Sequence, residues 1–543
     1  MMQQVLLKGI FLTIISIGLI ASCTDSGGGN SGSASNQRSI KLVGHCQFDA
    51  VPDDTLYDLV INNGRVMDPE CNFDGDRNVG IKDGRIVTIS QGELTGKEVL
   101  DAAGLVVAPG FIDTQIHATD PFSMRMFALD GVTTALDLEV GVLDVEPYYQ
   151  ELSNQSLLNF GATANYEGAR IFVMDGIKHP KGTHANYVLQ TRVLSGEDGK
   201  LSWAEDIATP EQKIEIEKLL NQSLADGALG IGLPLEYYAK VMTSREVLDI
   251  QKLAKKYDRI VGVHTRISAV MSLPAPYTLG AQEVMANAMA IDGALIVMHM
   301  ANKDWKVVYE LCRGASKQGF NIFCEYYPYR AGFPNAGSPT MVPDVIESFG
   351  VVIERDVMDP STGEYITKEE LINLRKTDSG RKLAVFINTK EDQEDWISME
   401  DVAITNDALP MVMEDGSFPA MDMPLTEYRG HPRSIGSRSR LLAMTRDQNL
   451  PLMNAVNNAS YVPAKYLSKL GLKAMQERGR MQPGTVADIT IFNADTVQDN
   501  ATYTFGEQGL PPTGIPYVIV NGEFIVKDSK VILDAKPGQG IRY

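Results

Sequence analysis

Positive charge is scarce in this chain relative to negative charge. Its 543 residues carry 49 Lys and Arg against 69 Asp and Glu, which gives a formal net charge of −20. Nucleic-acid binding needs clustered Lys and Arg that displace counterions from phosphate, and an anionic membrane surface would repel so acidic a chain. We therefore expect no nucleic-acid partner. A hydrophobic fraction of 44% still allows a large core and more than one structural unit.

Glycine fingerprints of nucleotide binding are also missing. Neither a Walker pattern nor a Rossmann pattern occurs, and no internal repeat stands out. The sequence therefore offers no support for a nucleotide site or for a repeat architecture.

No apolar run near the N-terminus is long enough to span a bilayer as a helix. The stretch Gly9–Ala21 is too short for that but suits a secretion signal, and it leads into Cys23 in a setting that resembles the bacterial lipobox. We predict a lipoprotein signal peptide at 1–22 and a Gly/Ser-rich tether at 23–45, with lipid attached to Cys23. The alternative is a plain cleaved signal with a free Cys23. The expected location is the bacterial periplasm or cell envelope. We expect the lipid to be the only membrane contact and to anchor the protein to the outer membrane.

Cysteine is rare, with five in the chain. In an exported protein Cys46 and Cys71 can pair, because that compartment permits disulfides, but the sequence leaves this open. Cys312 and Cys324 lie in apolar helix-like and strand-like contexts, so we expect them to be buried free thiols.

Both ends of the chain contain short alternating strands. Turn signals occur at Asn63-Gly64, Asp83-Gly84 and Asn521-Gly522. Strands near the C-terminus are expected at Val486–Phe492 and Tyr517–Phe524. We predict that segments 46–108 and 478–543 close into one small β-sandwich domain.

The middle of the chain, 109–477, alternates apolar strands with helical stretches, which is typical of parallel β-α units. The expected strands are Gly110–His117, Val132–Glu139, Gly161–Glu167, Ala228–Leu235, Ile260–Arg266, Ala294–Met300, Asn321–Tyr329 and Ala403–Ala408. Eight such strands imply an α/β fold, a (β/α)8 TIM-like barrel whose catalytic groups come from the C-terminal strand ends. The segment at about 331–399 is too long for a simple connection, so we expect an inserted helical subdomain or lid before the last strand.

Histidine is rare as well, and three of the seven stand where apolar strands end. These are His117, His264 and His299. A lone His on a strand is usually structural, but three on one rim of a barrel favour a shared site. Glu139 and Asp407 end strands on the same rim, and carboxylates clustered with imidazoles suit Zn²⁺ binding or proton transfer.

Several short motifs follow one another in a specific order. They are Val107–Asp113, Asp130–Glu139, Tyr327–Tyr329, Asn406–Pro410, Gly430–Arg433 and Gly479–Asp488. In this order they resemble the amidohydrolase superfamily, and within it the D-aminoacylase and N-acyl-D-glutamate deacylase group, from about Tyr57 to the C-terminus.

The resemblance implies a metal-dependent hydrolase of carbon–nitrogen bonds other than peptide bonds. It places a tightly held Zn²⁺ on Glu139, His264 and His299. Members usually carry His-x-His at the end of strand one, where this chain has Gln115-Ile116-His117. Because Gln115 replaces an imidazole, we expect one tightly bound zinc and a weak second position at His117.

The same resemblance makes Asp407 the acid/base. Zn²⁺ supplies activated water at neutral pH and polarises the amide carbonyl. Asp407 would take the proton of that water and deliver it to the departing amine. The products would be a carboxylic acid and a free amine.

The substrate is predicted from a few further positions. Tyr327 and Arg433 match family positions that hold the α-carboxylate of an N-acyl amino acid, and Arg binds carboxylate bidentately. Arg330 is a candidate for selecting an acidic side chain. Many D-aminoacylases carry a Lys at the position of Ala301. In this chain Lys303 is a candidate to supply the missing amine. We predict deacylation of N-acyl-D-amino acids, with acidic ones such as N-acyl-D-glutamate as candidates.

Two other functions stay open. One is another amide hydrolase of the same superfamily, which opens cyclic amides or cleaves a dipeptide. Cyclic-amide hydrolases of this group typically bridge two metals with a carboxylated Lys on strand four, and the absence of Lys from Ala228–Leu235 disfavours them. A non-catalytic lipoprotein derived from the fold is the other alternative, favoured by Gln115 and by the missing Lys. His179 and His184 lie in a polar segment that forms either a lid or an exposed loop.

Overall fold

The computed structural model describes residues 46–51, 54–177, 191, 195, 201–266, 276–300, 304–348, 350–411, 413 and 417–543. The predictions for Cys23, His179, His184, Ala301 and Lys303 lie outside the described residues. Residues Leu42–Tyr543 form one compact unit. Among the described helices, none has the length and apolar character needed to cross a lipid bilayer.

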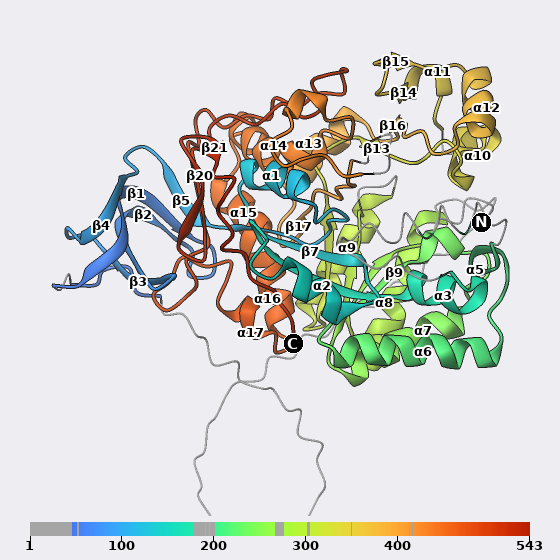
Figure 1. Ribbon diagram of the computed structural model, residues 1–543, viewed down its shortest axis with the longest axis horizontal. Coiled ribbons are helices and arrows are strands. Elements are labelled where there is room, and N and C mark those ends of the chain that lie inside the picture. The colour runs from blue at the N-terminus through green and yellow to red at the C-terminus, as the bar shows by residue number, and fades with distance from the viewer. Residues whose placement is uncertain are drawn as a thin grey trace, which may run out of the picture. The chain divides into compact units, whose positions relative to one another are not determined.

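A central sheet of eight parallel strands runs in the order β17-β12-β11-β10-β9-β8-β7-β6 (Figure 1). The strands are β6 (Phe111–Asp113), β7 (Val132–Val142), β8 (Asn159–Asn165), β9 (Gly230–Pro234), β10 (Ile260–His264), β11 (Ala294–Val297), β12 (Ile322–Tyr326) and β17 (Ala403–Ile404). Just beyond β6 and β17, Ile116 pairs in parallel with Ala408, and the His117 amide donates to the Ala408 carbonyl at 2.8 Å. This pairing closes the sheet, so the predicted (β/α)8 barrel is confirmed.

Helices accompany the barrel strands along the chain. They are α1 (Pro121–Leu129), α2 (Val145–Leu152), α3 (Tyr166–Asp175), α5 (Ser202–Glu205), α6 (Pro210–Ala225), α7 (Ser244–Lys256), α8 (Pro276–Ile291), α9 (Trp305–Lys317), α13 (Lys390–Ile397), α14 (Arg433–Asp447), α15 (Leu452–Val456), the π-helical turn η4 (Asn457–Tyr461), α16 (Val462–Ser468) and α17 (Lys473–Gln476). In α7, Val247, Ile250 and Leu253 recur at helical spacing and are buried, and the helix packs on β9 and β10. The capping box of Thr209 and Gln212 begins α6.

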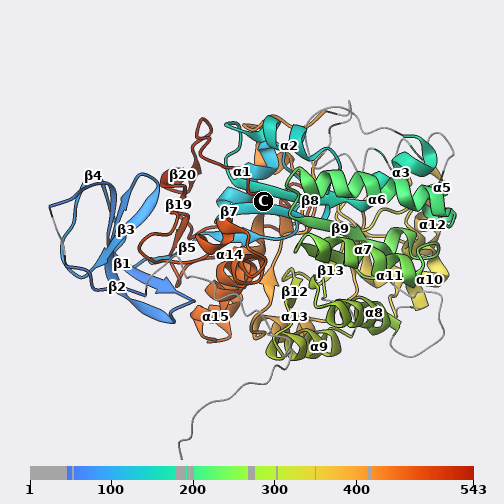
Figure 2. The same ribbon diagram turned by 90° about the horizontal axis from the view of Figure 1, so that it is seen from below.

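The two ends of the chain form one nine-stranded sheet, which Figures 1 and 2 show as blue strands beside red ones. Its strands are β1 (Leu56–Asp68), β2 (Phe73–Lys82), β3 (Arg85–Ser90), β4 (Thr95–Asp101), β5 (Val106–Pro109), β18 (Ile489–Phe492), β19 (Tyr517–Val520), β20 (Glu523–Lys527) and β21 (Lys530–Val531). β5 pairs antiparallel with β18, and residues of both ends, such as Ile61 and Ile519, share one apolar core. The two chain ends therefore combine in one sheet, while the predicted domain bounds and the sandwich packing stay predictions.

Two of the three predicted turns are present. Asp83-Gly84 joins β2 to β3 and Asn521-Gly522 joins β19 to β20, each pair with positive φ angles as tight hairpin turns require. The prediction of a turn at Asn63-Gly64 is wrong, because these residues lie inside β1 at a register shift in its pairing with β2. A Cβ at Gly64 would stand 2.4 Å from the Val107 side chain, so the glycine serves close packing at a bulge.

The predicted insertion between β12 and β17 is present, but it is not purely helical. It contains β13 (Ala331–Gly332), η2 (Pro339–Met341), α10 (Pro343–Ser348), α11 (Ile353–Asp356), β14 (Val357–Asp359), β15 (Glu364–Tyr365), α12 (Lys368–Thr377) and β16 (Ala384–Phe386). The strands form a small sheet in the order β13-β16-β14-β15. Strands of two or three residues are too short to show alternation, which is why the sequence pattern missed them.

Both pairs of described cysteines form disulfides. Cys46 and Cys71, whose pairing was open, are bonded with a Cα–Cα distance of 5.9 Å. Cys312 and Cys324 are bonded at 6.3 Å, so the prediction of free thiols is wrong. The apolar contexts were read correctly, since both residues are buried, but α9 and β12 lie side by side and bring the two thiols together.

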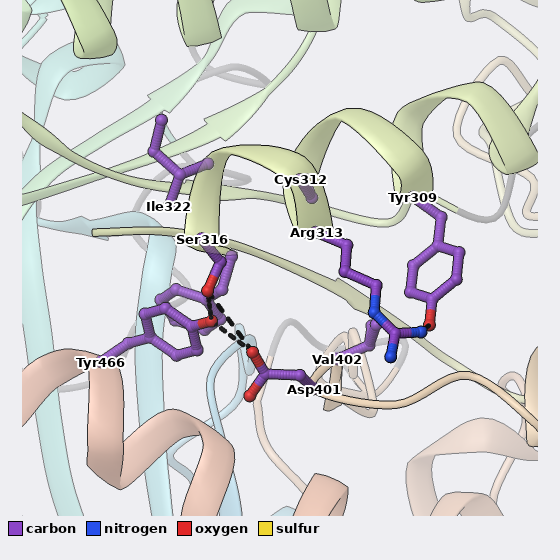
Figure 3. A pocket seen from close by; sticks show the side chains of 9 residues that line it. Tyr309, Cys312, Arg313, Ser316, Ile322, Asp401, Val402 and Tyr466 are labelled. Carbon is purple, nitrogen blue, oxygen red and sulfur yellow. Dashed lines mark hydrogen bonds between the residues drawn. The ribbon is translucent and has the colours of Figure 1, made fainter. Parts of the chain in front are cut away.

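A small pocket lies at the N-terminal ends of β12 and β17 (Figure 3), and we call it the barrel floor. Its lining residues are Tyr309, Cys312, Arg313, Ser316, Ile322, Phe323, Asp401, Val402 and Tyr466. Asp401 accepts hydrogen bonds from Lys465 Nζ at 2.8 Å and from the Tyr466 hydroxyl at 2.6 Å. Its polar groups therefore bind one another, at the end of the barrel where residues usually serve stability.

Candidate metal centre and active site

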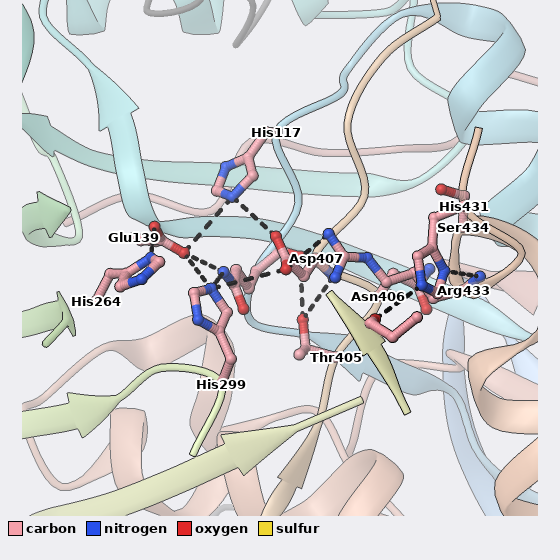
Figure 4. A network of polar contacts seen from close by, with 12 residues as sticks. His117, Glu139, His264, His299, Thr405, Asn406, Asp407, His431, Arg433 and Ser434 are labelled. Carbon is pink, nitrogen blue, oxygen red and sulfur yellow. Dashed lines mark hydrogen bonds and ion pairs between the residues drawn. The ribbon is translucent and has the colours of Figure 1, made fainter. Parts of the chain in front are cut away.

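The five residues predicted for the site lie together at the C-terminal strand ends, the barrel mouth (Figure 4). They form two overlapping groups, in each of which the ligand atoms lie within 4.8 Å of one another. The groups are Glu139 with His264 and His299, and His117 with Glu139 and Asp407. Glu139 belongs to both groups and is therefore the centre of the cluster.

Glu139 reaches this position because β7 bulges. The pairing of β7 with β8 breaks between Asp137 and Val142, and a bulge of this kind re-aims a side chain. The bulged backbone needs space inside the barrel. A Cβ at Gly232 would stand 2.3 Å from the Glu139 carbonyl oxygen, and one at Gly262 would stand 2.0 Å from the Leu138 carbonyl oxygen. Glycine on the two strands β9 and β10 therefore makes room for Glu139.

The first group has short contacts between potential ligand atoms. Glu139 Oε1 lies 3.1 Å from His264 Nδ1, and Glu139 Oε2 lies 2.8 Å from His299 Nε2. The two imidazole rings are 4.4 Å apart and nearly perpendicular. His299 has a φ of +32°, a left-handed backbone that a residue of this size rarely adopts. Strain of this kind concentrates at functional sites.

The second group is arranged around His117. Its Nδ1 lies 3.3 Å from Asp137 Oδ2, while its Nε2 lies 3.6 Å from Glu139 and 3.5 Å from Asp407. The side-chain amide of Gln115 contacts both Glu139 and His299. The amide that replaces the expected imidazole therefore lies at the cluster itself.

Asp407 is fixed by its backbone and by Arg433. It has a φ of +45°, and its Oδ2 lies 2.7 Å from Arg433 Nη2. The residue before it, Asn406, donates its amide to Asp113, which is paired with the fully buried Arg438 at 2.7 Å. Burial alone would raise the pKa of Asp407, but Arg433 and then His299 lower it below its usual value. Asp407 is therefore a carboxylate at neutral pH.

The donor types of the cluster fit a divalent cation. Burial favours a raised pKa for Glu139, yet His299 and His264 hold it well below the usual range. Burial would lower the pKa of His117, yet Asp137 holds it well above. The carboxylate oxygens and imidazole nitrogens of each group lie within 4.8 Å of one another, and they are donors that Zn²⁺ accepts. The described residues can therefore hold a metal ion.

Two of the three predicted substrate residues, Tyr327 and Arg433, lie beside the cluster. Arg433 is 3% exposed, and its guanidinium lies 4.4 Å from the centre of the Tyr327 ring. Arg330 is farther away, over the Phe386 ring of the insertion at 5.5 Å. Thus Tyr327 and Arg433 adjoin the cluster, whereas Arg330 stands at the border with the insertion.

Three further residues at the site were missed in the sequence. Glu236, in the turn η1 (Leu235–Tyr238) after β9, contacts His264 Nε2. Tyr503, in the long β18–β19 connection, has its hydroxyl 3.0 Å from His431 Nε2. His431 accepts the Arg433 amide at its Nδ1, and burial, then Arg433, hold its pKa well below the usual range. Glu236 follows a predicted strand and could have been found by position, whereas nothing near Tyr503 in the sequence marks it.

Comparison with known proteins gives a consistent picture. No family model matches the chain. It is 23% identical over 506 residues to a D-aminoacylase of Alcaligenes xylosoxydans xylosoxydans, covering 87% of this chain and 94% of the relative. It is 25% identical over 493 residues to an N-acyl-D-glutamate deacylase of the same organism, covering 86% and 93%. A dihydroorotase of Clostridioides difficile is 28% identical over 485 residues, covering 86% and 99%.

Solved structures share the fold. An N-acyl-D-glutamate deacylase from Bordetella bronchiseptica, in complex with zinc and a phosphonate inhibitor, matches with a TM-score of 0.69 at 21% identity, covering 90% of this chain and 100% of that one. A D-hydantoinase from Bacillus sp. AR9 matches with a TM-score of 0.55 at 16% identity, covering 89% and 98%. The resemblance to the D-aminoacylase group of amidohydrolases is confirmed. This amidohydrolase-like chain is a hydrolase of carbon–nitrogen bonds other than peptide bonds.

Proposed function

We propose that this protein is a zinc-dependent deacylase of N-acyl-D-amino acids, which releases a carboxylic acid and a free D-amino acid. One Zn²⁺ would be held by Glu139, His264 and His299, with a weaker second position at His117. Relatives and solved structures named for this activity support the proposal, and the geometry of Arg433 carries it.

Arg433 is a buried cation with an unused donor. Its Nε has no hydrogen-bond partner among the described residues, although the side chain is almost fully buried. An unsatisfied buried donor of this kind is costly unless a ligand binds it. Since Arg433 adjoins both Asp407 and Tyr327, a carboxylate bound there would place the neighbouring amide at the metal cluster. This is the shape of an N-acyl α-amino acid.

The chemistry requires a base that later acts as an acid. A bound Zn²⁺ would supply activated water and polarise the scissile carbonyl. Asp407, ionised at neutral pH, accepts the proton of the attacking water at a carboxylate oxygen and returns it to the departing nitrogen. His117, 3.5 Å from Asp407, orients that carboxylate during the transfer.

An acidic side chain is the substrate feature that Arg330 would select. Arg330 lies over the Phe386 ring, and the Phe386 ring lies 5.0 Å from the ring of Tyr503, centre to centre. A second carboxylate at this border would meet the positive charge of Arg330. Acidic N-acyl-D-amino acids are therefore the preferred substrates in this proposal.

Hydrolysis of a panel of N-acetyl-D- and N-acetyl-L-amino acids tests the proposal. We expect turnover of the N-acetyl-D-amino acids, with a higher kcat/KM for N-acetyl-D-glutamate than for N-acetyl-D-leucine. Arg433→Lys should lower kcat/KM about 10²-fold, mainly through KM, because Lys cannot bind carboxylate bidentately. Arg330→Gln should lower kcat/KM for N-acetyl-D-glutamate and leave kcat/KM for N-acetyl-D-leucine unchanged. Preference for an L-substrate would overturn the stereochemical claim.

Hydrolysis of a cyclic amide is the second candidate, favoured by the similarity to dihydroorotase. β9 (Gly230–Pro234) carries no Lys that could be carboxylated, which argues against it. Dihydroorotate and a hydantoin belong in the same panel, and their turnover in preference to N-acetyl-D-amino acids would select this function.

We also propose that the protein is exported and anchored by lipid at Cys23. The two disulfides, Cys46–Cys71 and Cys312–Cys324, support an oxidising compartment. Metabolic labelling with a fatty acid should mark the wild type but not Cys23→Ser. Equal labelling of both would exclude Cys23 as the lipid site.

A further inference from the structure

Glu236 lies at the barrel mouth outside both candidate ligand groups. It follows the end of β9, in the turn η1, and its carboxylate contacts His264 Nε2. Both side chains are mostly buried, with 17% and 16% exposed. The contact therefore joins two partly desolvated groups, where a hydrogen bond to a carboxylate is strong.

The two nitrogens of His264 face opposite partners. Nδ1 lies 3.1 Å from Glu139 Oε1, on the side of the ligand group that also contains His299. Nε2 faces Glu236. An imidazole that binds a metal through one nitrogen carries a proton on the other, and that N–H needs an acceptor. Nδ1 is therefore the metal-facing nitrogen and Nε2 carries the proton.

His117 shows the same arrangement within this chain. Its Nδ1 meets Asp137 at 3.3 Å, and its Nε2 faces Glu139 and Asp407. Two of the imidazoles at the mouth thus have a carboxylate behind the ring. The repetition points to a functional arrangement and not to one accidental contact.

Strand pairing and a hydrogen bond fix the position of Glu236 relative to His264. β9 and β10 pair in register up to Pro234 and His264, so the turn after β9 starts level with His264. Arg266, two residues beyond His264, donates to the Ala239 carbonyl at 2.7 Å, just after η1. The turn that carries Glu236 and the strand end that carries His264 are therefore fixed to each other.

We propose that Glu236 is a positioning residue for the metal centre. Its carboxylate accepts the Nε2–H of His264, which fixes the tautomer and ring orientation and makes Nδ1 a better donor to the metal. This inference rests on the metal centre of the proposed function, and it assigns to Glu236 a role through His264 and not a direct metal bond.

Zinc affinity of the full chain tests this role without any substrate. The dissociation constant is measured by competition with a chromogenic chelator for the wild type, Glu236→Ala and Glu236→Gln. Loss of such a partner typically weakens metal binding about 10–100-fold, which we expect for Glu236→Ala. Glu236→Gln keeps the size and an acceptor oxygen but loses the charge, so it should bind at least threefold more weakly than the wild type and more tightly than Glu236→Ala.

Glu246→Gln is the matched control. Glu246 is also a buried carboxylate, which accepts from the Tyr166 hydroxyl at 2.6 Å and lies 3.4 Å from Arg170. This variant should lose stability yet keep the wild-type zinc affinity. If Glu236→Ala does not fold, Glu236→Gln decides alone.

Two outcomes would overturn the inference: zinc affinity of the Glu236 variants within threefold of the wild type, or equal weakening in Glu246→Gln. Absence of zinc binding by the folded wild type would instead overturn the metal centre of the proposed function. The two failures are thereby distinguished.

Discussion

The mouth and the floor of the barrel both contain acidic side chains that are at least half-buried, but their charges are balanced in different ways. At the floor, Asp401 has Lys465 at 2.8 Å and the Tyr466 hydroxyl at 2.6 Å (Figure 3). At the mouth, Glu139 is surrounded by imidazoles, and Arg433 pairs with Asp407 (Figure 4). Imidazoles are neutral or charged according to pH, so the mouth depends on what binds there. The polar groups of the floor bind one another, whereas in the proposed function a cation completes the mouth.

Removing the charge of Glu139 should have the largest effect. Glu139→Gln takes away the one carboxylate that both ligand groups share. A direct ligand contributes more than the 10–100-fold of an indirect partner, so we expect zinc affinity to fall about 10³-fold and amide hydrolysis to fall to background. Chelator competition and amine release measure the two effects. Full zinc content and activity in this variant would show that the mouth does not need its central carboxylate.

Asp407→Asn should separate catalysis from metal binding. The variant keeps the shape of the side chain but replaces the basic carboxylate with a neutral amide, so kcat should fall about 10²–10⁴-fold. Zinc content should stay at the wild-type level, because Asp407 is outside the group formed by Glu139, His264 and His299. An active Asp407→Asn would remove Asp407 from its role as acid/base.

Acidification should weaken zinc binding at the mouth. Burial lowers the pKa of His264, but Glu236 and then Glu139 raise it well above its usual value. A raised pKa means that the proton is held to higher pH, and zinc must displace it. Affinity should therefore fall as pH falls, by about tenfold per pH unit for each displaced proton. Chelator competition at a series of pH values measures the slope, and a flat profile would show that the imidazoles are already neutral.

Sequence periodicity was sufficient to predict the barrel because most of its strands are short apolar runs with a helix before the next strand. The rule that polar groups at C-terminal strand ends meet predicted that His117, His264 and Glu139 lie near one another, and the structure brings them together. Hairpin chemistry was reliable at Asp83-Gly84 and failed at Asn63-Gly64. Asn63-Gly64 lies at a register shift within β1, where its glycine closely approaches the Val107 side chain.

Contacts between distant segments could not be predicted in this way. Tyr503 reaches His431 from a connection between two strands of the other domain, and no local pattern encodes such a path. Cys312 and Cys324 are bonded because α9 packs on β12, which is a tertiary relation. The glycines at 232 and 262 were visible, but their purpose depends on the bulge of β7, which periodicity does not reveal.

Asp401→Asn at the floor should give the smallest effect and no effect on catalysis. Burial would raise the pKa of Asp401, but the hydrogen bond from Lys465 holds it below the usual value. A depressed folded-state pKa means that the stabilisation is present above the unfolded-state pKa and is lost as pH falls through the folded-state pKa. The variant should thus lose about 1 kcal/mol at neutral pH, and the difference from the wild type should shrink on acidification. Denaturant unfolding at two pH values measures this difference in the free energy of unfolding. Zinc affinity and kcat should match the wild type, because the floor lies at the other end of the barrel from the candidate metal centre. Loss of zinc in Asp401→Asn would mean that floor and mouth are coupled.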